Sequence, residues 1–232
     1  MSRKVTAIIV AAGSGKRFGG QVKKQFLEIN GKPVLRYTLE RFQACDKIDD
    51  ITVVVPQEGL QRLTSEIPDQ WGLSKVKKVI SGGAERQDSV WAALKKLQDD
   101  VEIVAVHDGV RPFITSEMIA KLVDAAGKYG AALVGVKPKD TIKLTREAVV
   151  VETLDRRSLV SVQTPQVFKK ELLVKAYQKA RLDEYKSTDD SALVENLGEK
   201  VVVVEGSYEN IKITSPEDIV IAEAFLNRDA SK

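Results

Sequence analysis

Six short runs of aliphatic and β-branched residues constrain the fold of this 232-residue chain more than any other feature. Each run is continuously apolar rather than alternating, which is typical of a parallel strand covered on both faces. The runs are Thr6–Val10, Ile51–Val55, Val76–Ile80, Ile103–Val106, Leu133–Val136 and Val201–Val204. They predict a buried, mainly parallel sheet.

Amphipathic helices are predicted between these runs, because apolar residues recur there at helical spacing. The expected faces are Leu35, Leu39 and Phe42 after Pro33; Val90, Ala93, Leu94 and Leu97; Met118, Ile119, Leu122, Val123 and Ala126, ending near Gly130; and a last helix that begins at Ser215-Pro216. Strands alternating with helices imply right-handed crossovers, so we predict an α/β, doubly wound fold. The length suits one domain, residues 1–232. Ligands of such sheets bind outside the carboxyl ends of the strands.

One segment interrupts this alternation. Residues from Thr141 to Thr153 form two β runs joined by the polar turn Thr145-Arg146-Glu147. An isolated hairpin is marginally stable in water, so we expect it to pack on something, such as another subunit. The sequence therefore predicts a β-hairpin arm at about 139–158.

Composition excludes several classes of protein. The chain is 43% hydrophobic and 30% charged, with 36 basic and 33 acidic residues and a net charge of +3. This charge is too small to suggest a nucleic-acid or membrane-surface partner. It is unevenly distributed, since residues 1–36 hold eight basic side chains and one acidic one. That segment is suited to small polyanions.

The expected location is the cytoplasm. The single cysteine, Cys45, cannot form an internal disulfide or a zinc cluster, and no apolar run approaches the ~18 residues of a membrane span. Arg3-Lys4 and the apolar residues 5–12 imitate a signal peptide. They turn directly into a glycine-rich loop, however, which favours a buried first strand.

That loop, Ala11-Ala12-Gly13-Ser14-Gly15-Lys16-Arg17, is the strongest local signal. Glycines let backbone N–H groups approach a phosphate, and the cations add charge. A Walker A loop is excluded because Arg17 follows Lys16, and the dinucleotide fingerprint is excluded because position 18 is Phe. The alternative is a simple turn, which leaves the adjacent cations unexplained.

Two further strand exits carry candidate site residues. The segment from Ser81 to Ser89, with Gly82-Gly83, could hold a flat ring, or could be only a loop and helix cap. The third exit presents Asp108, a natural ligand for Mg²⁺ together with water and phosphate. Its neighbour His107 has no nucleophile or second His spaced around it, so we interpret it as a packed or hydrogen-bonding residue.

Together these exits resemble the 2-C-methyl-D-erythritol 4-phosphate cytidylyltransferase family. The resemblance rests on the motifs 11–17, Lys24-Gln25-Phe26, Gly82-Gly83, 107–112, Thr164-Pro165-Gln166 and Asn210-Ile211-Lys212, in order from residue 6 to about residue 226. It implies a Rossmann-like nucleotidyltransferase fold and transfer of CMP from CTP to methylerythritol phosphate in non-mevalonate isoprenoid biosynthesis. It also implies Mg²⁺ as cofactor and a homodimer in which the hairpin acts as a dimerisation arm.

The resemblance also implies roles for individual residues. Arg17 and Lys24 would stabilise the transition state, while Lys212 and Arg156 would hold the incoming phosphate. Asp108 would bind the metal and the nucleotide. The remaining candidates are Ala11, Ala12, Gly13, Gly15, Gly83, Ala84 and Ser89 for CTP, and Thr141 and Thr164 for the substrate.

Alternatives remain at several positions. Lys24 could be a solvated surface cation, Arg157 could replace its neighbour Arg156, and Ala84 lacks the polar side chain that relatives often carry. Thr188-Asp189-Asp190 could contact substrate, or could cap a helix that ends near Gly198. The rival functions are a ribitol-5-phosphate cytidylyltransferase, a non-catalytic nucleotide-binding module, and a dinucleotide-dependent oxidoreductase, which the failed fingerprint opposes.

Overall fold

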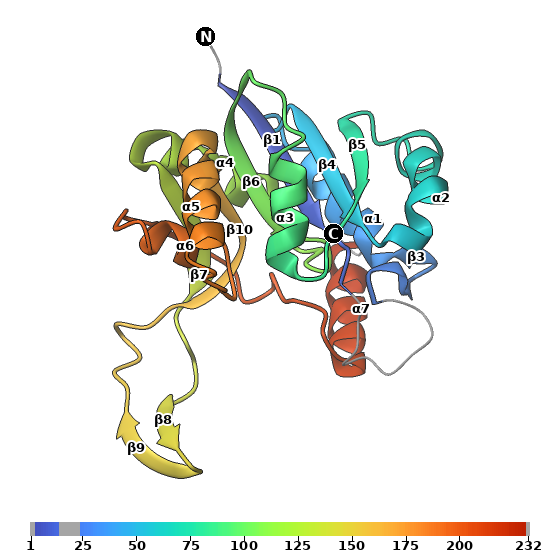
Figure 1. The fold of residues 1–232 in the computed structure, drawn as a ribbon. Helices are drawn as coiled ribbons and strands as arrows, with labels where there is room; N and C mark the ends of the chain where they lie inside the picture. Colours follow the sequence, from blue (N-terminus) through green and yellow to red (C-terminus); the bar gives the residue numbers. More distant parts are fainter. Residues whose placement is uncertain (1–2, 14–23, 231–232) are drawn as a thin grey trace.

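A seven-stranded sheet forms the centre of the protein (Figure 1). The computed structural model describes residues 3–13 and 24–230. The strand order is β11-β7-β10-β6-β1-β4-β5. The bounds are β1 Lys4–Val10, β4 Asp50–Val55, β5 Val76–Ser81, β6 Val101–Asp108, β7 Ala131–Val136, β10 Ser161–Lys169 and β11 Val202–Glu205. Neighbouring strands are parallel except at β10, which runs antiparallel to both β6 and β7.

Helices cover both faces of the sheet. They are α1 Val34–Gln43, α2 Leu60–Ser65, α3 Arg86–Leu94, α4 Ser116–Tyr129, α5 Lys170–Leu182, α6 Ser191–Glu195 and α7 Pro216–Ala230. Alternate residues of β1 face opposite cores: Ala7 and Ile9 pack in the core of α1, α2 and α4, whereas Ile8 packs in the core of α3, α5 and α6. This two-sided burial explains why the strands are continuously apolar. It confirms the predicted α/β, mainly parallel, doubly wound sheet.

The order of the strands creates a crevice beside β1. The chain passes from β1 to β4 and β5 on one side, and then returns to place β6 on the other side. The last residues of the two strands, Val10 and Asp108, are register partners. A reversal of strand order of this kind separates the loops that follow the two strands and opens a ligand-binding crevice.

Strand β10 and helix α5 were not predicted. Gln163, Thr164 and Gln166 of β10 are buried polar residues, so this strand lacks the apolar pattern that identified the others. The predicted helix that carries Val90 also ends at Leu94, so Leu97 lies beyond it. These differences affect one strand, one helix and a helix boundary, and leave the fold class unchanged.

The predicted hairpin is present as β8 Lys143–Arg146 and β9 Val149–Thr153, which pair antiparallel. It leaves the sheet after β7 and returns at β10, where Val136 and Ser161 are register partners. Figure 1 shows it extending away from the body of the protein. Every residue of both strands is exposed in the single chain. We keep the term "arm" for residues 137–160.

A smaller cluster lies beside the crevice. The two-stranded ribbon of β2 Glu28–Ile29 and β3 Lys32–Pro33 precedes α1, and Ile29 packs with Ile213 and Ala222 of the C-terminal segment. This contact joins the start of α1 to α7. Among the described residues, no helix combines the length and apolar character required to cross a membrane.

Candidate active site

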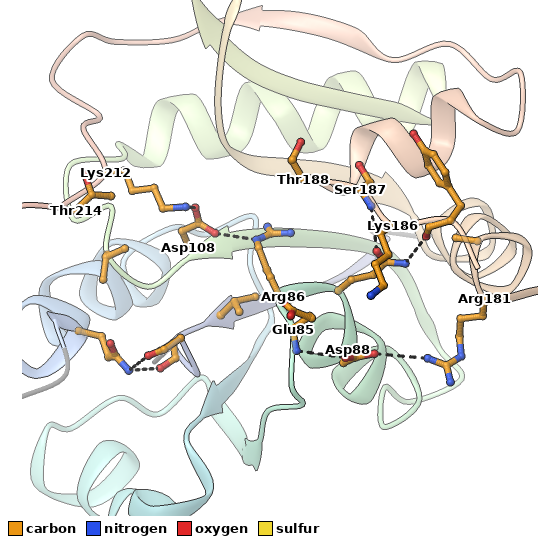
Figure 2. A pocket seen from close by; sticks show the side chains of 18 of the residues that line it. Glu85, Arg86, Asp88, Asp108, Arg181, Lys186, Ser187, Thr188, Lys212 and Thr214 are labelled. Atoms are coloured by element: carbon orange, nitrogen blue, oxygen red, sulfur yellow. Dashed lines mark hydrogen bonds and ion pairs between the residues drawn. The ribbon is translucent and has the colours of Figure 1, made fainter. Parts of the chain in front are cut away.

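A pocket of about 940 Å³ lies at the carboxyl ends of β1 and β6. Its walls come from the exit of β1, the start of α3, the end of β6, the end of α5 with residues 184–188, and the C-terminal residues Lys212 and Thr214. Figure 2 shows Arg86, Asp108 and Lys212 pointing toward one another in this pocket. The pocket therefore occupies the crevice that the strand order creates.

Asp108 is the centre of a cationic cluster. Its Oδ1 accepts a hydrogen bond from Arg86 Nε at 3.1 Å, and its Oδ2 lies 2.7 Å from Lys212 Nζ and 3.8 Å from Arg111 Nε. The carboxylate is 9% exposed. Three cations around one acid leave a net positive charge, which favours a phosphate-bearing ligand.

The same arrangement determines the ionisation of these groups. Burial alone would raise the pKa of Asp108, but the charges of Arg86, Lys212 and Arg111 hold it well below its usual range. Burial likewise opposes the charge of Arg86, yet Asp190 and Asp108 raise its pKa. Asp108 and Arg86 are therefore both ionised at neutral pH.

His107 lies beneath the cluster and is fully buried. Burial lowers its pKa to about 4, so the ring is neutral near pH 7. Nε2 is 3.0 Å from the carbonyl oxygen of Arg111 and therefore carries the proton that it donates. Nδ1 then accepts from the Thr164 hydroxyl at 3.0 Å, and that hydroxyl accepts from the Asp108 N–H at 3.1 Å. This confirms the interpretation of His107 and places Thr164 under the floor of the pocket, where it supports Asp108.

The second glycine loop packs tightly against the first. A Cβ on Gly82 would lie 2.3 Å from Cβ of Ala12 and 2.7 Å from Oγ of Ser89. The Ser89 hydroxyl accepts from the Gly83 N–H and donates to the Glu85 carbonyl, both at 3.1 Å. In this structure it fastens the loop instead of facing the pocket, and α3 also begins with the predicted cap, through reciprocal bonds of Glu85 and Asp88. Ala84 is exposed beside it.

Gln25 is hydrogen-bonded to the first residues of the phosphate loop. Its side chain is buried and donates from Nε2 to the carbonyls of Ala11 at 2.6 Å and Gly13 at 3.3 Å. Ala11 and Gly13 line the pocket. Gly15 and Arg17 lie outside the described residues, as does the side chain of Lys24, whose backbone begins a short 3₁₀ helix, Lys24–Phe26.

Two predicted substrate residues lie on the arm. Thr141 is exposed, and the exposed Arg156 donates from Nη1 to the Lys139 carbonyl at 2.6 Å. The neighbouring Arg157 binds Asp155 instead. Neither Thr141 nor Arg156 lines the pocket of its own chain. Lys212 does line the pocket, where its Nζ contacts Asp108.

Sequence reasoning missed three residues of this site. Arg86 and Gln25 both stood inside motifs that were quoted, but no role was assigned to either. Asp190 is buried at the start of α6 and binds Arg86. Neither of the two roles expected for it, substrate contact or helix capping, includes this ion pair. Its neighbour Asp189 caps α6 by accepting from the Ala192 N–H, and Thr188 lines the pocket. A useful signal for Arg86 was its place at the first turn of a helix directly after a glycine loop.

A doubly wound sheet with glycine loops and a cationic cluster at its central crevice is typical of enzymes that bind nucleotides and other phosphate compounds. The family model for IspD, 2-C-methyl-D-erythritol 4-phosphate cytidylyltransferase, matches residues 5–228. A protein of that name from Clostridium perfringens (strain SM101 / Type A) is 46% identical over 224 residues, which is 96% of this chain and 99% of the relative. One from Clostridium botulinum (strain Langeland / NCTC 10281 / Type F) is 44% identical, covering 97% and 98%. The chain belongs to the 2-C-methyl-D-erythritol 4-phosphate cytidylyltransferase family.

Solved structures agree with this assignment. The crystal structure of 4-diphosphocytidyl-2C-methyl-D-erythritol synthase from Anaerococcus prevotii DSM 20548 has a TM-score of 0.87 at 36% identity, covering 97% of both chains. That of 2-C-methyl-D-erythritol 4-phosphate cytidylyltransferase from Thermus thermophilus has a TM-score of 0.77 at 32% identity, covering 95% of this chain and 98% of that one. The resemblance found in the sequence motifs is thus confirmed.

Proposed function

We propose that this protein transfers CMP from CTP to the phosphate of 2-C-methyl-D-erythritol 4-phosphate, releasing pyrophosphate, in non-mevalonate isoprenoid precursor biosynthesis. Membership of the family over nearly the whole chain supports the reaction. The observation that carries the assignment of the site is the cationic cluster around Asp108, which lies opposite the exit of β1.

In the proposed reaction, an oxygen of the acceptor phosphate attacks the α-phosphorus of CTP. A new P–O bond forms there, the bond to the β-phosphate bridging oxygen breaks, and that oxygen leaves with pyrophosphate. An ionised phosphate needs no general base. The protein's task is therefore to align two polyanions and to stabilise the charge that gathers on the phosphoryl oxygens.

The residues divide this task by position. Lys212 is 38% exposed at the pocket wall, so its ammonium can leave Asp108 partly and bind the incoming phosphate. The backbone at Ala11 and Gly13 provides the nucleotide seat, together with the loop that contains Gly83. On the family motif, we assign Arg17 and Lys24 to stabilisation of the transition state. Gln25, which follows Lys24, anchors the start of the first glycine loop through its hydrogen bond to Ala11.

Asp108 fits a Mg²⁺ site in which the protein supplies a single carboxylate. It is the carboxylate that Arg86, Arg111 and Lys212 share, and the described residues contain no group of three or more His, Cys, Asp or Glu side chains placed to hold a metal. Mg²⁺ is commonly bound by one or two carboxylates, with water and phosphate oxygens as the other ligands. Asp108 would supply the carboxylate, and the bound ion would neutralise charge on the phosphates.

We further propose that the arm completes the site of a second copy of the chain. Leu144, Val149, Val150 and Val151 are 44%, 67%, 55% and 54% exposed on the arm, which is an apolar surface that a lone chain leaves in water. Arg156 lies on the same arm and outside the pocket of its own chain. A homodimer would bury these four apolar side chains and could carry Arg156 and Thr141 to the acceptor phosphate in the neighbour's site.

The reaction is tested by supplying each of the four nucleoside triphosphates with Mg²⁺ and either methylerythritol phosphate or ribitol phosphate, and measuring pyrophosphate release. We expect turnover with CTP and methylerythritol phosphate. Faster release with ribitol phosphate would refute the acceptor. Absence of release with every pair would favour a binding module without turnover.

The arm is tested with mixed dimers. Arg156→Ala and Lys24→Ala chains carry different tags, and the heterodimer is isolated by both. If Arg156 acts in the neighbour's site, one site of the heterodimer is intact and activity returns to about half of wild type per dimer. A verified heterodimer as inactive as its parents, or a monomer in sedimentation, would contradict the proposal.

We also place the protein in the cytoplasm, because its one cysteine, Cys45, is a buried free thiol.

A further inference from the structure

Arg86 makes two ion pairs on opposite sides of one guanidinium. It is the first residue of α3. Nε donates to Asp108 Oδ1 at 3.1 Å, and Nη1 donates to Asp190 Oδ2 at 2.7 Å. Asp190 is 1% exposed and does not line the pocket. The guanidinium thus joins a pocket carboxylate to a carboxylate buried at the start of another helix.

Asp190 is itself held in one orientation. The Tyr177 hydroxyl donates to its Oδ1 at 2.5 Å, and its backbone N–H donates to Oε1 of Gln166 at 3.0 Å. Tyr177 of α5 therefore fixes the carboxylate that Arg86 binds, while Gln166 of β10 holds the backbone that carries it. Because the donors of a guanidinium lie in a rigid plane, fixing one edge also fixes the direction of Nε.

The orientation of the Asp108 carboxylate depends on Arg86. The torsion that turns an aspartate carboxylate is broad, so hydrogen bonds must set its orientation. Lys212 and Arg111 both approach Oδ2, while Arg86 binds Oδ1. Without Arg86 the carboxylate would be free to rotate toward the other two cations. Figure 2 shows Arg86 and Lys212 on the two oxygens of Asp108.

We propose that Arg86 is a positioning residue, which holds the Asp108 carboxylate by clamping it to Asp190 and so makes the rate of cytidylyl transfer depend on a buried residue outside the pocket. The inference rests on the proposed function. It differs from the roles assigned to Lys212 and Asp108, because neither Arg86 nor Asp190 is required to touch a reacting atom.

The test uses two neighbouring substitutions of equal charge change. Asp190→Asn removes the ion pair with Arg86. Asp189→Asn is the matched control, since Asp189 binds Gln166, Ser191 and the Ala192 N–H but not Arg86. For each variant we would measure kcat, Tm, and the affinity and stoichiometry of CTP binding by calorimetry. The stoichiometry counts intact sites, so kcat per site is independent of any unfolded fraction.

We expect Asp190→Asn to lower kcat per site about tenfold, as loss of an outer partner of a site carboxylate does, with the Kd of CTP changed by less than about twofold. Asp189→Asn should lower Tm yet keep kcat per site within about twofold of wild type. Equal losses of kcat per site in the two variants, or full kcat in Asp190→Asn, would overturn the proposal.

A second variant covers the case in which Asp190→Asn does not fold. Arg86 is 26% exposed, so Arg86→Lys should be accommodated, but one ammonium cannot span both carboxylates. We expect kcat per site to fall at least about tenfold, and wild-type kcat would overturn the proposal. An inactive wild type would instead refute the proposed function, while leaving CTP binding to report on the site.

Discussion

His107 should make the stability of the protein depend on pH in a definite window. The side chain is fully buried, and burial lowers its pKa from 6.5 to about 4. In the unfolded chain the imidazole regains its ordinary pKa. Between pH 6.5 and about pH 4 the unfolded state therefore binds a proton that the folded state does not, and the free energy of unfolding falls as the pH falls. The contribution is complete above pH 6.5.

The size of the effect follows from the separation of the two pKa values. A difference of about 2.5 pH units corresponds to about 3 kcal/mol of unfolding free energy, lost progressively on acidification. For a protein of ordinary stability this is a large fraction of the total. Because the neutral ring also joins Thr164 to the Arg111 carbonyl, its protonation would disrupt the support beneath Asp108.

The assay is chemical denaturation of the metal-free protein at several pH values within this window, for wild type and His107→Gln. Glutamine does not titrate, so the unfolding free energy of the His107→Gln variant should fall less on acidification than that of wild type. The difference between the two losses should be about 3 kcal/mol over the whole window. The comparison uses slopes, which are insensitive to any constant destabilisation by the substitution. Carboxylates titrate in both proteins and cancel. Parallel pH dependences would refute the reasoning.

Three further predictions concern the second glycine loop and the motif Lys24-Gln25-Phe26. Lys24→Ala should lower kcat by at least about 10²-fold, as loss of one preorganised charge does, and a loss below about tenfold in steady-state assays would mean that Lys24 is only a surface cation. Gly82→Ala places a methyl group against Ala12 and Ser89 and should cost about 1–3 kcal/mol of stability; an unchanged Tm would contradict the close packing. Gln25→Ala leaves two carbonyls at the end of β1 without their donor and should cost about 1–3 kcal/mol, with a lower kcat in the same assay; wild-type stability would show that the side chain is not an anchor.

Most of the sheet could be predicted because its strands are covered on both faces. Residues such as Ile8 and Ile9 pack in opposite cores, and that demand appears in the sequence as an unbroken apolar run. Strand β10 gave no such signal. Its buried Gln163 and Gln166 are tolerated because residues distant in sequence provide hydrogen-bond partners: Asn210 and Ser207 for Gln163, and residues 189–191 for Gln166. Partners of that kind have no local sequence pattern.

The sequence by itself determined most of the elements and the chemistry at their ends. Strand exits with glycines, cations and Asp108 are local patterns, since loop conformation and phosphate binding depend on residues close in the chain. Only the tertiary structure decided which exits meet. It placed β6 beside β1, so that Asp108 and Ala11 line the same pocket, and it paired Arg86 with Asp190 across 104 residues. An ion pair between distant elements depends on how the sheet is ordered and how its helices pack, and neither is encoded in the residues next to the pair.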